Sequence, residues 1–196
     1  LQLLVHCFKF AALLRHLGKL SHRFFLFCLN HRKLLCHRLG FLHFDLNGFS
    51  DSLSNNCPIG NVAEPNNIIA VYWDDLVLRN PPSTIAGGFV QAFSPCPYDD
   101  GGTGDCVIFQ WDNCDDFGGG IDSFDFQAVL YDSGTILMKY PEGAGGTPTD
   151  PRFNPEHGSG STTGLENADA SDSITSACDE NNSITADFAV MFVYPL

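Results

Sequence analysis

Two groups of carboxylates in this sequence have the side chains that acid–base or metal chemistry needs. Asp74 and Asp75 form the first group and follow an apolar run that ends at Trp73. A glycosidase places its two carboxylates on either side of one bond, whereas neighbouring residues at a strand end point to opposite sides. We therefore expect a structural role for this pair, in which one carboxylate caps a turn and the other meets solvent.

The second group lies in a glycine-rich loop that contains Asp99, Asp100 and Asp105. Hard oxygen ligands on a loop suit Ca²⁺, so these three residues are the predicted metal ligands and calcium is the one cofactor that the sequence suggests. Their spacing does not match the EF-hand loop, and a solvated acidic loop is the alternative. Tyr98, in the same loop, is the best aromatic candidate for contact with a ligand.

Catalysis by this chain is not expected. A Ser–His–Asp triad needs a histidine, and beyond residue 43 the only histidine is His157, which lies in a glycine-rich loop. The Gly-x-Ser-x-Gly elbow of the α/β-hydrolases is absent as well. We predict no catalytic residues, although a catalytic domain elsewhere on a longer parent chain is compatible with the sequence.

The cysteines indicate an oxidising compartment. Cys96 and Cys106 bracket a turn-rich loop, and a disulfide across it would stabilise the fold by ~2–3 kcal/mol. Such bonds persist in secreted proteins. Cys57, Cys114 and Cys178 complete the set of five in residues 45–196, and their pairing is left open. No Cys-x-x-Cys motif is present, which argues against a redox centre or a zinc ribbon.

Charge is distributed unevenly along the chain. Of the 10 Lys and Arg residues, seven lie in residues 1–44, which contain no Asp or Glu. All 23 acidic residues lie in residues 45–196. A strongly acidic body repels nucleic acid and anionic membranes, so nucleic acid is excluded as a partner, and basic or neutral partners are favoured.

Residues 1–39 form a basic leader that is rich in Leu, Phe and His. Its basic residues interrupt every apolar run, so it resembles neither a signal peptide nor a membrane span. A basic amphipathic helix on a membrane surface is one interpretation. The other is a segment translated from the wrong frame or strand, which the nucleotide sequence around codon 40 would reveal. In both cases we expect the domain to comprise residues 40–196, and the leader to lie outside its fold.

Residues 40–196 have the alternation of β-strands and no convincing helical period. Phe126, Ala128 and Leu130 alternate with polar or outward-facing residues, and a turn at Gly134 leads into a return strand. Eight such segments are expected in total, in residues 40–45, 67–73, 88–93, 107–111, 124–131, 136–140, 161–166 and 186–194. Their spacing predicts an all-β fold, an antiparallel, jelly-roll-like β-sandwich of about eight strands.

The predicted core of this sandwich is aromatic and aliphatic. Each of its members lies on an expected strand, most of them on the face opposite polar residues. The predicted core residues are Trp73, Phe109, Trp111, Phe126, Leu130, Phe188 and Phe192.

Several of these segments together resemble a known module. Residues 65–76, 107–111, 126–136, 158–167 and 188–195 are similar, in this order, to a β-sandwich module of large secreted bacterial surface proteins, and the module is distantly nidogen-like. Such modules often lie beside subtilisin-like peptidase, fibronectin-type or PKD domains. The resemblance implies no catalytic residues.

These observations lead to one functional expectation with two rivals. We expect a non-catalytic extracellular or cell-surface module for adhesion or spacing, whose partners are the other domains of a larger secreted protein and, beyond it, a glycan or a surface protein. The rivals are an accessory domain of a secreted subtilisin-like serine peptidase and a carbohydrate-binding module.

Overall fold

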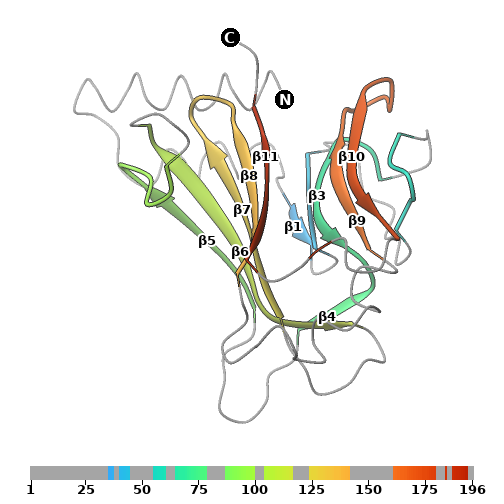
Figure 1. Cartoon of the computed structure of the whole chain (residues 1–196), viewed down its shortest axis with the longest axis horizontal. Coiled ribbons are helices and arrows are strands. Elements are labelled where there is room, and N and C mark those ends of the chain that lie inside the picture. The colour runs from blue at the N-terminus through green and yellow to red at the C-terminus, as the bar shows by residue number, and fades with distance from the viewer. Residues whose placement is uncertain are drawn as a thin grey trace.

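The chain folds into two antiparallel β-sheets that face each other (Figure 1). This computed structural model describes residues 35–37, 40–44, 55–60, 65–78, 87–99, 104–116, 124–141, 161–179, 184 and 187–193. All regular elements in these residues are strands, eleven in number. The all-β sandwich expected from the alternating pattern is therefore confirmed.

The first sheet, sheet A, has five strands in the order β1-β2-β3-β9-β10, and every neighbouring pair is antiparallel. β3 lies at its centre and is buried along its whole length, as its uninterrupted apolar sequence requires. The strands are β1 (Leu35–His37), β2 (Phe41–His43), β3 (Ile68–Trp73), β9 (Thr162–Glu166) and β10 (Ser173–Cys178).

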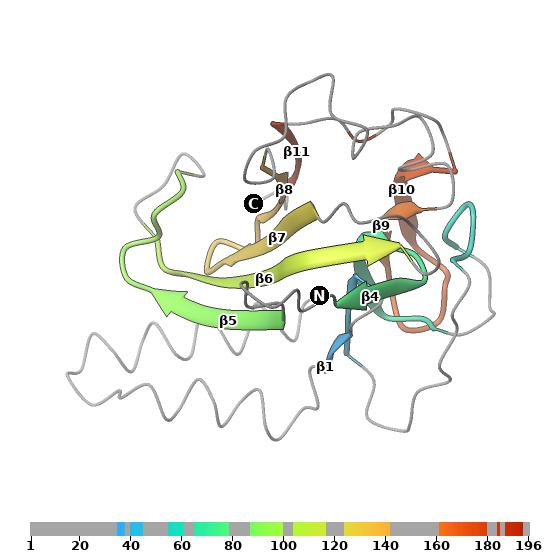
Figure 2. The same cartoon turned by 90° about the horizontal axis from the view of Figure 1, so that it is seen from below.

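The second sheet, sheet B, has six strands and is built around the long strand β6. β4 pairs with the C-terminal end of β6 and β5 with its N-terminal part, on the same side, as Figure 2 shows. On the other side follow β7, β8 and β11. The bounds are β4 (Leu76–Leu78), β5 (Gly87–Phe93), β6 (Cys106–Asp116), β7 (Phe124–Tyr131), β8 (Ile136–Tyr140) and β11 (Phe188–Phe192).

Three strands were not expected from the sequence: β1, β4 and β10. β1 lies before the predicted domain boundary at residue 40 and pairs with β2 through Leu35↔His43 and His37↔Phe41. The rest of the leader, residues 1–34 and 38–39, lies outside the described residues. The extent of the domain at its N-terminal end therefore stays a prediction.

The central core fills the space between the sheets. Phe109, Trp111, Phe126 and Leu130 all belong to it, as predicted, whereas Phe188 and Phe192 are half-buried at its margin. The prediction for Trp73 was wrong in position. Its ring is fully buried, but it belongs to a separate cluster with Phe41, Ile59, Ile68 and Ala70.

A β-bulge explains the position of Trp73. The register between β3 and β9 shifts between Ala70 and Trp73, and the backbone N–H groups of Val71 and Tyr72 both donate to the carbonyl of Gly40 at 3.0 Å. Strict alternation would put residues 71 and 73 on the same face. The bulge interrupts that alternation, as bulges do, so Val71 contributes to the central core and Trp73 does not.

The bulge also ties the two sheets together. The carbonyl oxygen of Val71, on sheet A, accepts hydrogen bonds from the hydroxyl of Tyr140, on sheet B, and from the Thr163 hydroxyl at 2.9 Å. Burial raises the pKa of Tyr140 further above its already high usual value, so this hydroxyl remains a donor at neutral pH. A backbone acceptor that would otherwise be orphaned in the core is thereby satisfied.

Replacing Gly40 with alanine should strongly destabilise the domain. Gly40 has φ +77°, and an added Cβ would lie inside van der Waals contact of the Tyr72 carbonyl oxygen. We expect Gly40→Ala to cost at least ~2–3 kcal/mol, measured by urea unfolding. Gly87→Ala is the matched control, because its Cβ would meet nothing closer than the Phe89 ring at 3.5 Å. Equal stability of the two variants would contradict the role of Gly40.

Candidate functional site

A short segment closed by a disulfide covers the outer face of sheet B. Cys96 is bonded to Cys106, the first residue of β6, so the disulfide predicted across this loop is present. The N–H of Cys96 also donates to the carbonyl of Gly104 at 3.0 Å. The segment lies on a second apolar cluster, which comprises Cys106, Ile108, Val129, Tyr131 and Leu137 with Phe93, Cys96 and Tyr98 packed against it.

Tyr98 holds this segment on the sheet. Its hydroxyl donates to Oε1 of Gln127 at 3.0 Å, and Nε2 of Gln127 donates to Oε1 of Gln110 at 3.1 Å. Nζ of Lys139 lies 3.3 Å from the centroid of the Tyr98 ring, which is a cation–π contact. One face of the ring is therefore occupied by the protein itself, and any ligand contact of Tyr98 would use its other face or its edge.

Gln127 and Lys139, which contact Tyr98, and Gln110 belong to a cross-strand row. In the register of sheet B, Phe89 of β5 lies opposite Gln110 of β6, Gln110 opposite Gln127 of β7, and Gln127 opposite Lys139 of β8. Residues directly opposite each other share a face. The Phe89 side chain is 45% exposed. The outer face of sheet B thus presents an aromatic ring, two amides and an ammonium group in one line.

Two carboxylates lie beside this row. Asp112 of β6 and Asp125 of β7 lie on the same outer face, each two residues along its strand from a glutamine of the row. Burial raises the pKa of Asp112, and the negative charge of Asp125 and a hydrogen bond between the two carboxyl groups raise it further. Like charges held close in this way disfavour ionisation.

Removing the charge of Asp112 should stabilise the domain at neutral pH. Because its pKa is higher in the folded than in the unfolded chain, the folded state holds this proton more tightly, and stability falls as pH rises through the acidic range. Asp112→Asn should therefore raise the thermal midpoint at pH 7 and leave it nearly unchanged near pH 3. Asp99→Asn, at an exposed residue of the neighbouring loop, is the control. A lower midpoint for Asp112→Asn at pH 7 would contradict the expected sign.

The predicted calcium ligands are only partly visible. Asp99 is exposed, Asp105 is half-buried, and Asp100 lies outside the described residues. Within the described ranges, the one group of potential metal ligands is Cys57, Cys178 and Asp179. The two sulfurs of that group are bonded to each other, so they are not thiolate ligands. Calcium binding at Asp99, Asp100 and Asp105 stays a prediction.

Asp74 caps the link between the two sheets. Its carboxylate accepts a hydrogen bond from the backbone N–H of Asp75 at 2.7 Å, at the point where the chain passes from β3 of sheet A to β4 of sheet B (Figure 1). Both side chains are half-buried. The expected turn-capping role of the pair is therefore seen for Asp74.

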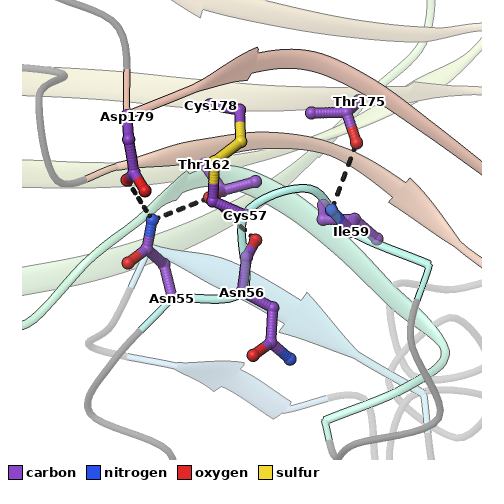
Figure 3. The surroundings of a disulfide bond; sticks show 8 residues. All are labelled: Asn55, Asn56, Cys57, Ile59, Thr162, Thr175, Cys178 and Asp179. Carbon is purple, nitrogen blue, oxygen red and sulfur yellow. Dashed lines mark hydrogen bonds between the residues drawn. A yellow bond between two sulfur atoms is a disulfide. The ribbon is translucent and has the colours of Figure 1, made fainter.

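A second disulfide attaches the segment of residues 55–60 to the outer face of sheet A, as Figure 3 shows. It joins Cys57 to Cys178 at the end of β10, whereas Cys114 takes part in neither disulfide and is buried. The sequence left the pairing of these three cysteines open. Nδ2 of Asn55 donates to Thr162 and to Asp179, both at 2.8 Å. These bonds hold the segment of residues 55–60 against sheet A, with Ile59 in the cluster around Trp73.

The remaining candidate is an apolar groove at one end of the sandwich. It has a volume of about 360 Å³ and lies between the ends of β8 and β11 in sheet B and the β9–β10 hairpin of sheet A. Ile136, Leu165 and Phe192 contribute to its lining. Ile174 and Val193 also line it and are 54% and 67% exposed. The sequence did not reveal this groove, because its described lining comes from three regions that are distant in sequence, residues 134–136, 165–174 and 192–193.

The fold and these surfaces define a class of protein, a two-sheet antiparallel sandwich with a segment attached by a disulfide to the outer face of each sheet. A comparison with family models matches residues 17–192 to the NIDO-related family, so the chain belongs to this family. Domains of this family are typically extracellular, which agrees with the two disulfides. Neither the curated proteins nor the solved structures gave a significant match.

The family match confirms the nidogen-like part of the resemblance noted in the sequence. It begins at residue 17, inside the predicted leader. In the described part of the chain, no helix has the length and apolar character that spanning a membrane requires.

Proposed function

We propose that this chain is a non-catalytic extracellular or cell-surface module that serves adhesion or spacing within a larger secreted protein of the bacterial surface type. The observation that carries this proposal is the pair of segments attached by disulfides to the outer sheet faces, within a domain of the NIDO-related family. Disulfides of this kind persist outside the reducing cytosol. Such cross-links stabilise the fold by limiting the freedom of the unfolded chain.

The described polar residues support a binding or structural role better than a catalytic one. The histidine whose side chain the structure describes, His43, is 1% exposed and lies within sheet A. Asp74 and Asp75 lie where the chain passes from sheet A to sheet B, and the carboxylate of Asp74 accepts a hydrogen bond from the backbone N–H of Asp75. The outer row of sheet B consists of amides, an ammonium group and an aromatic ring. These groups can hold a ligand, and they include no activated nucleophile.

Adhesion can be measured with the whole chain. Beads coated with the oxidised protein should be retained under flow on cells of the organism that carries the gene. Beads coated with the reduced and alkylated chain should wash off, because the two outer segments are then released. A second control is an unrelated protein of equal negative charge, which separates specific adhesion from charge effects. Equal retention of all three would overturn the adhesive role.

The rival role as an accessory domain of a secreted subtilisin-like peptidase makes a different prediction. It requires a peptidase domain in the same reading frame as this chain. Sequencing of the complete parent gene decides between the two roles. A parent that contains surface-anchoring or repeat domains and no peptidase supports the adhesive module.

A carbohydrate-binding role is favoured by one specific observation, the outer row of sheet B. Amide side chains both donate and accept hydrogen bonds, and an exposed aromatic ring offers an apolar surface, which together suit a sugar's hydroxyls and its C–H face. Glycan-array screening of the intact chain should give signals that Phe89→Ala removes. Val90→Ala is the matched control, because Val90 is similarly exposed at 53% but its strand register places it on the opposite face. Absence of signal, or equal loss in both variants, argues against this role.

A further inference from the structure

β5 lies at the margin of sheet B and lacks the features that protect strand edges. Among the described strands it pairs only with β6, through seven consecutive residue pairs without a register shift. It is the longest of the described strands at the sheet margins. Its sequence, Gly-Gly-Phe-Val-Gln-Ala-Phe, contains no charged residue and no proline. Charges, prolines, bulges and short length are the usual protection of a strand edge, and β5 has none of them.

The side chains of β5 are exposed on both faces of the sheet. Phe89, on the outer face, is 45% exposed, and Val90, on the inner face, is 53% exposed. Val90 lies opposite Phe109 of β6, which is buried in the central core. Burial therefore falls steeply from β6 to β5, which lies away from the strands of sheet A (Figure 1). A strand added beside β5 would contact apolar side chains on both faces.

The distribution of charge favours a second copy of this chain as the added strand. Residues 45–196 contain all 23 acidic residues and only three basic ones, so two copies repel each other over most of their surfaces. Residues 80–98, which include β5, contain no Asp, Glu, Lys or Arg, and they form the longest uncharged stretch of this acidic part. Two copies can meet here without placing like charges opposite each other.

An antiparallel pair of β5 strands is also self-complementary. Val90 is the midpoint of the strand, so a two-fold axis at Val90 pairs all seven residues of one copy with all seven of the other. Val90 then lies opposite Val90 of the second copy, Phe89 opposite Gln91, and Gly88 opposite Ala92. Contacts of this kind, in which the same surface serves both subunits, are the commonest in homodimers.

The same symmetry keeps the acidic residues near β5 apart. Asp112 lies opposite Gly87, at one end of the β5–β6 pair, and is hydrogen-bonded to Asp125. In the antiparallel pair, Gly87 of each copy lies beside Phe93 of the other. The two carboxyl pairs therefore lie at opposite ends, roughly 20 Å apart along the strands. This distance exceeds the screening length of about 8 Å at physiological ionic strength.

We propose that two copies of this chain associate through antiparallel pairing of their β5 strands, which joins the two sheets B into one continuous sheet. A single pair of seven-residue strands is a small interface, and interfaces below about 1,200 Å² belong to weak complexes. The dimer is therefore weak and forms where copies are concentrated. The inference goes beyond the adhesive role proposed above and does not depend on it.

Sedimentation equilibrium of the full chain tests the proposal, with free thiols alkylated so that no disulfide joins two copies. The parent protein should show a monomer–dimer equilibrium with a Kd between about 1 µM and about 1 mM. Val90→Lys and Val90→Glu each place like charges on the two-fold axis, so each should weaken association at least about tenfold. An equimolar mixture of these two variants should associate again, because lysine then faces glutamate.

Two controls separate this effect from misfolding and from a general effect of charge. Val90→Thr keeps a β-branched, uncharged side chain and should associate like the parent. Ile174→Lys, on β10, changes a residue of equal exposure, 54%, and should also leave association unchanged. All four variants should keep the thermal midpoint of the parent, because both positions are exposed.

Three results would overturn the dimer. The first is a parent protein that stays monomeric up to about 1 mM. The second is a Val90→Lys variant that associates as well as the parent, or no better recovery in the mixture of Val90→Lys and Val90→Glu than in either variant alone. The third is an Ile174→Lys variant that weakens association as much as Val90→Lys does.

Discussion

Phe126→Ala should leave the domain largely unfolded or severely weakened. The Phe126 ring is fully buried between the sheets and stacks on Trp111 at 4.9 Å, with Tyr72 at 5.7 Å on sheet A. Truncation of a buried aromatic ring costs roughly 3–5 kcal/mol, which is a large part of the 5–15 kcal/mol typical of a domain. We expect urea unfolding and near-ultraviolet circular dichroism to show this loss.

Phe188→Ala provides the comparison for this prediction. The sequence pattern alone suggests an equal effect, but Phe188 is only half-buried and packs on Tyr140 at a ring distance of 6.0 Å, at the margin of the core. Its truncation should therefore cost clearly less than that of Phe126. If Phe126→Ala is tolerated as well as Phe188→Ala, the central core is not where the structure places it.

The second large effect is expected from the disulfide between Cys57 and Cys178. It links residues that are 121 positions apart, whereas the Cys96–Cys106 bond spans 10. The entropy that a cross-link removes from the unfolded chain grows with loop length, which gives about 5 kcal/mol for the long loop and about 3 kcal/mol for the short one. Cys57→Ser/Cys178→Ser should therefore destabilise the domain more than Cys96→Ser/Cys106→Ser does.

Urea unfolding of the two double variants measures this difference. Peptide mapping without reduction should first show both cross-linked pairs in the parent protein. A Cys114→Ser variant controls for the loss of a buried thiol, because Cys114 belongs to neither bond. The assignment fails if mapping joins Cys114 to Cys57 or Cys178. The loop-length argument fails if the short-loop variant is the less stable of the two.

Regular alternation was the part of the fold that the sequence predicted well. In β7 and β8, apolar residues recur at every second position, so the assignment of Phe126 and Met138 to the inner face and of Val129 and Leu137 to the outer face follows from the pleat. The turn between them needs a positive φ, and Gly134 has φ +90°. The local pattern determines both features.

Features that depend on irregular or distant contacts were missed. β10 has polar residues at three of its six positions, and only Ala177 is buried, so it lacks a clear strand signal. The bulge near Val71 places the Trp73 side chain on the opposite face of sheet A from the one that strict alternation predicts. The residue types in β3 do not indicate this bulge. The pairing of Cys57 with Cys178 depends on β10 lying beside β9, which is tertiary information.

The same contrast between local patterns and distant contacts applies to the candidate site. The Cys96–Cys106 bond could be predicted, because a turn-rich loop brings its ends together. The row from Phe89 to Lys139 depends on the register of four strands, and the groove on the meeting of two sheets. Sequence spacing carries no information on either arrangement.

The long disulfide has a mechanical consequence for a protein stretched between two attachments. Tension applied at the chain ends cannot pass through the residues between Cys57 and Cys178, because the covalent bond bypasses them. At about 3.4 Å per extended residue, the bond keeps roughly 400 Å of chain from being drawn out. Among the described strands only β1, β2 and β11 lie outside the bypassed residues, so most of both sheets is shielded from the pull and the domain extends by only a short length.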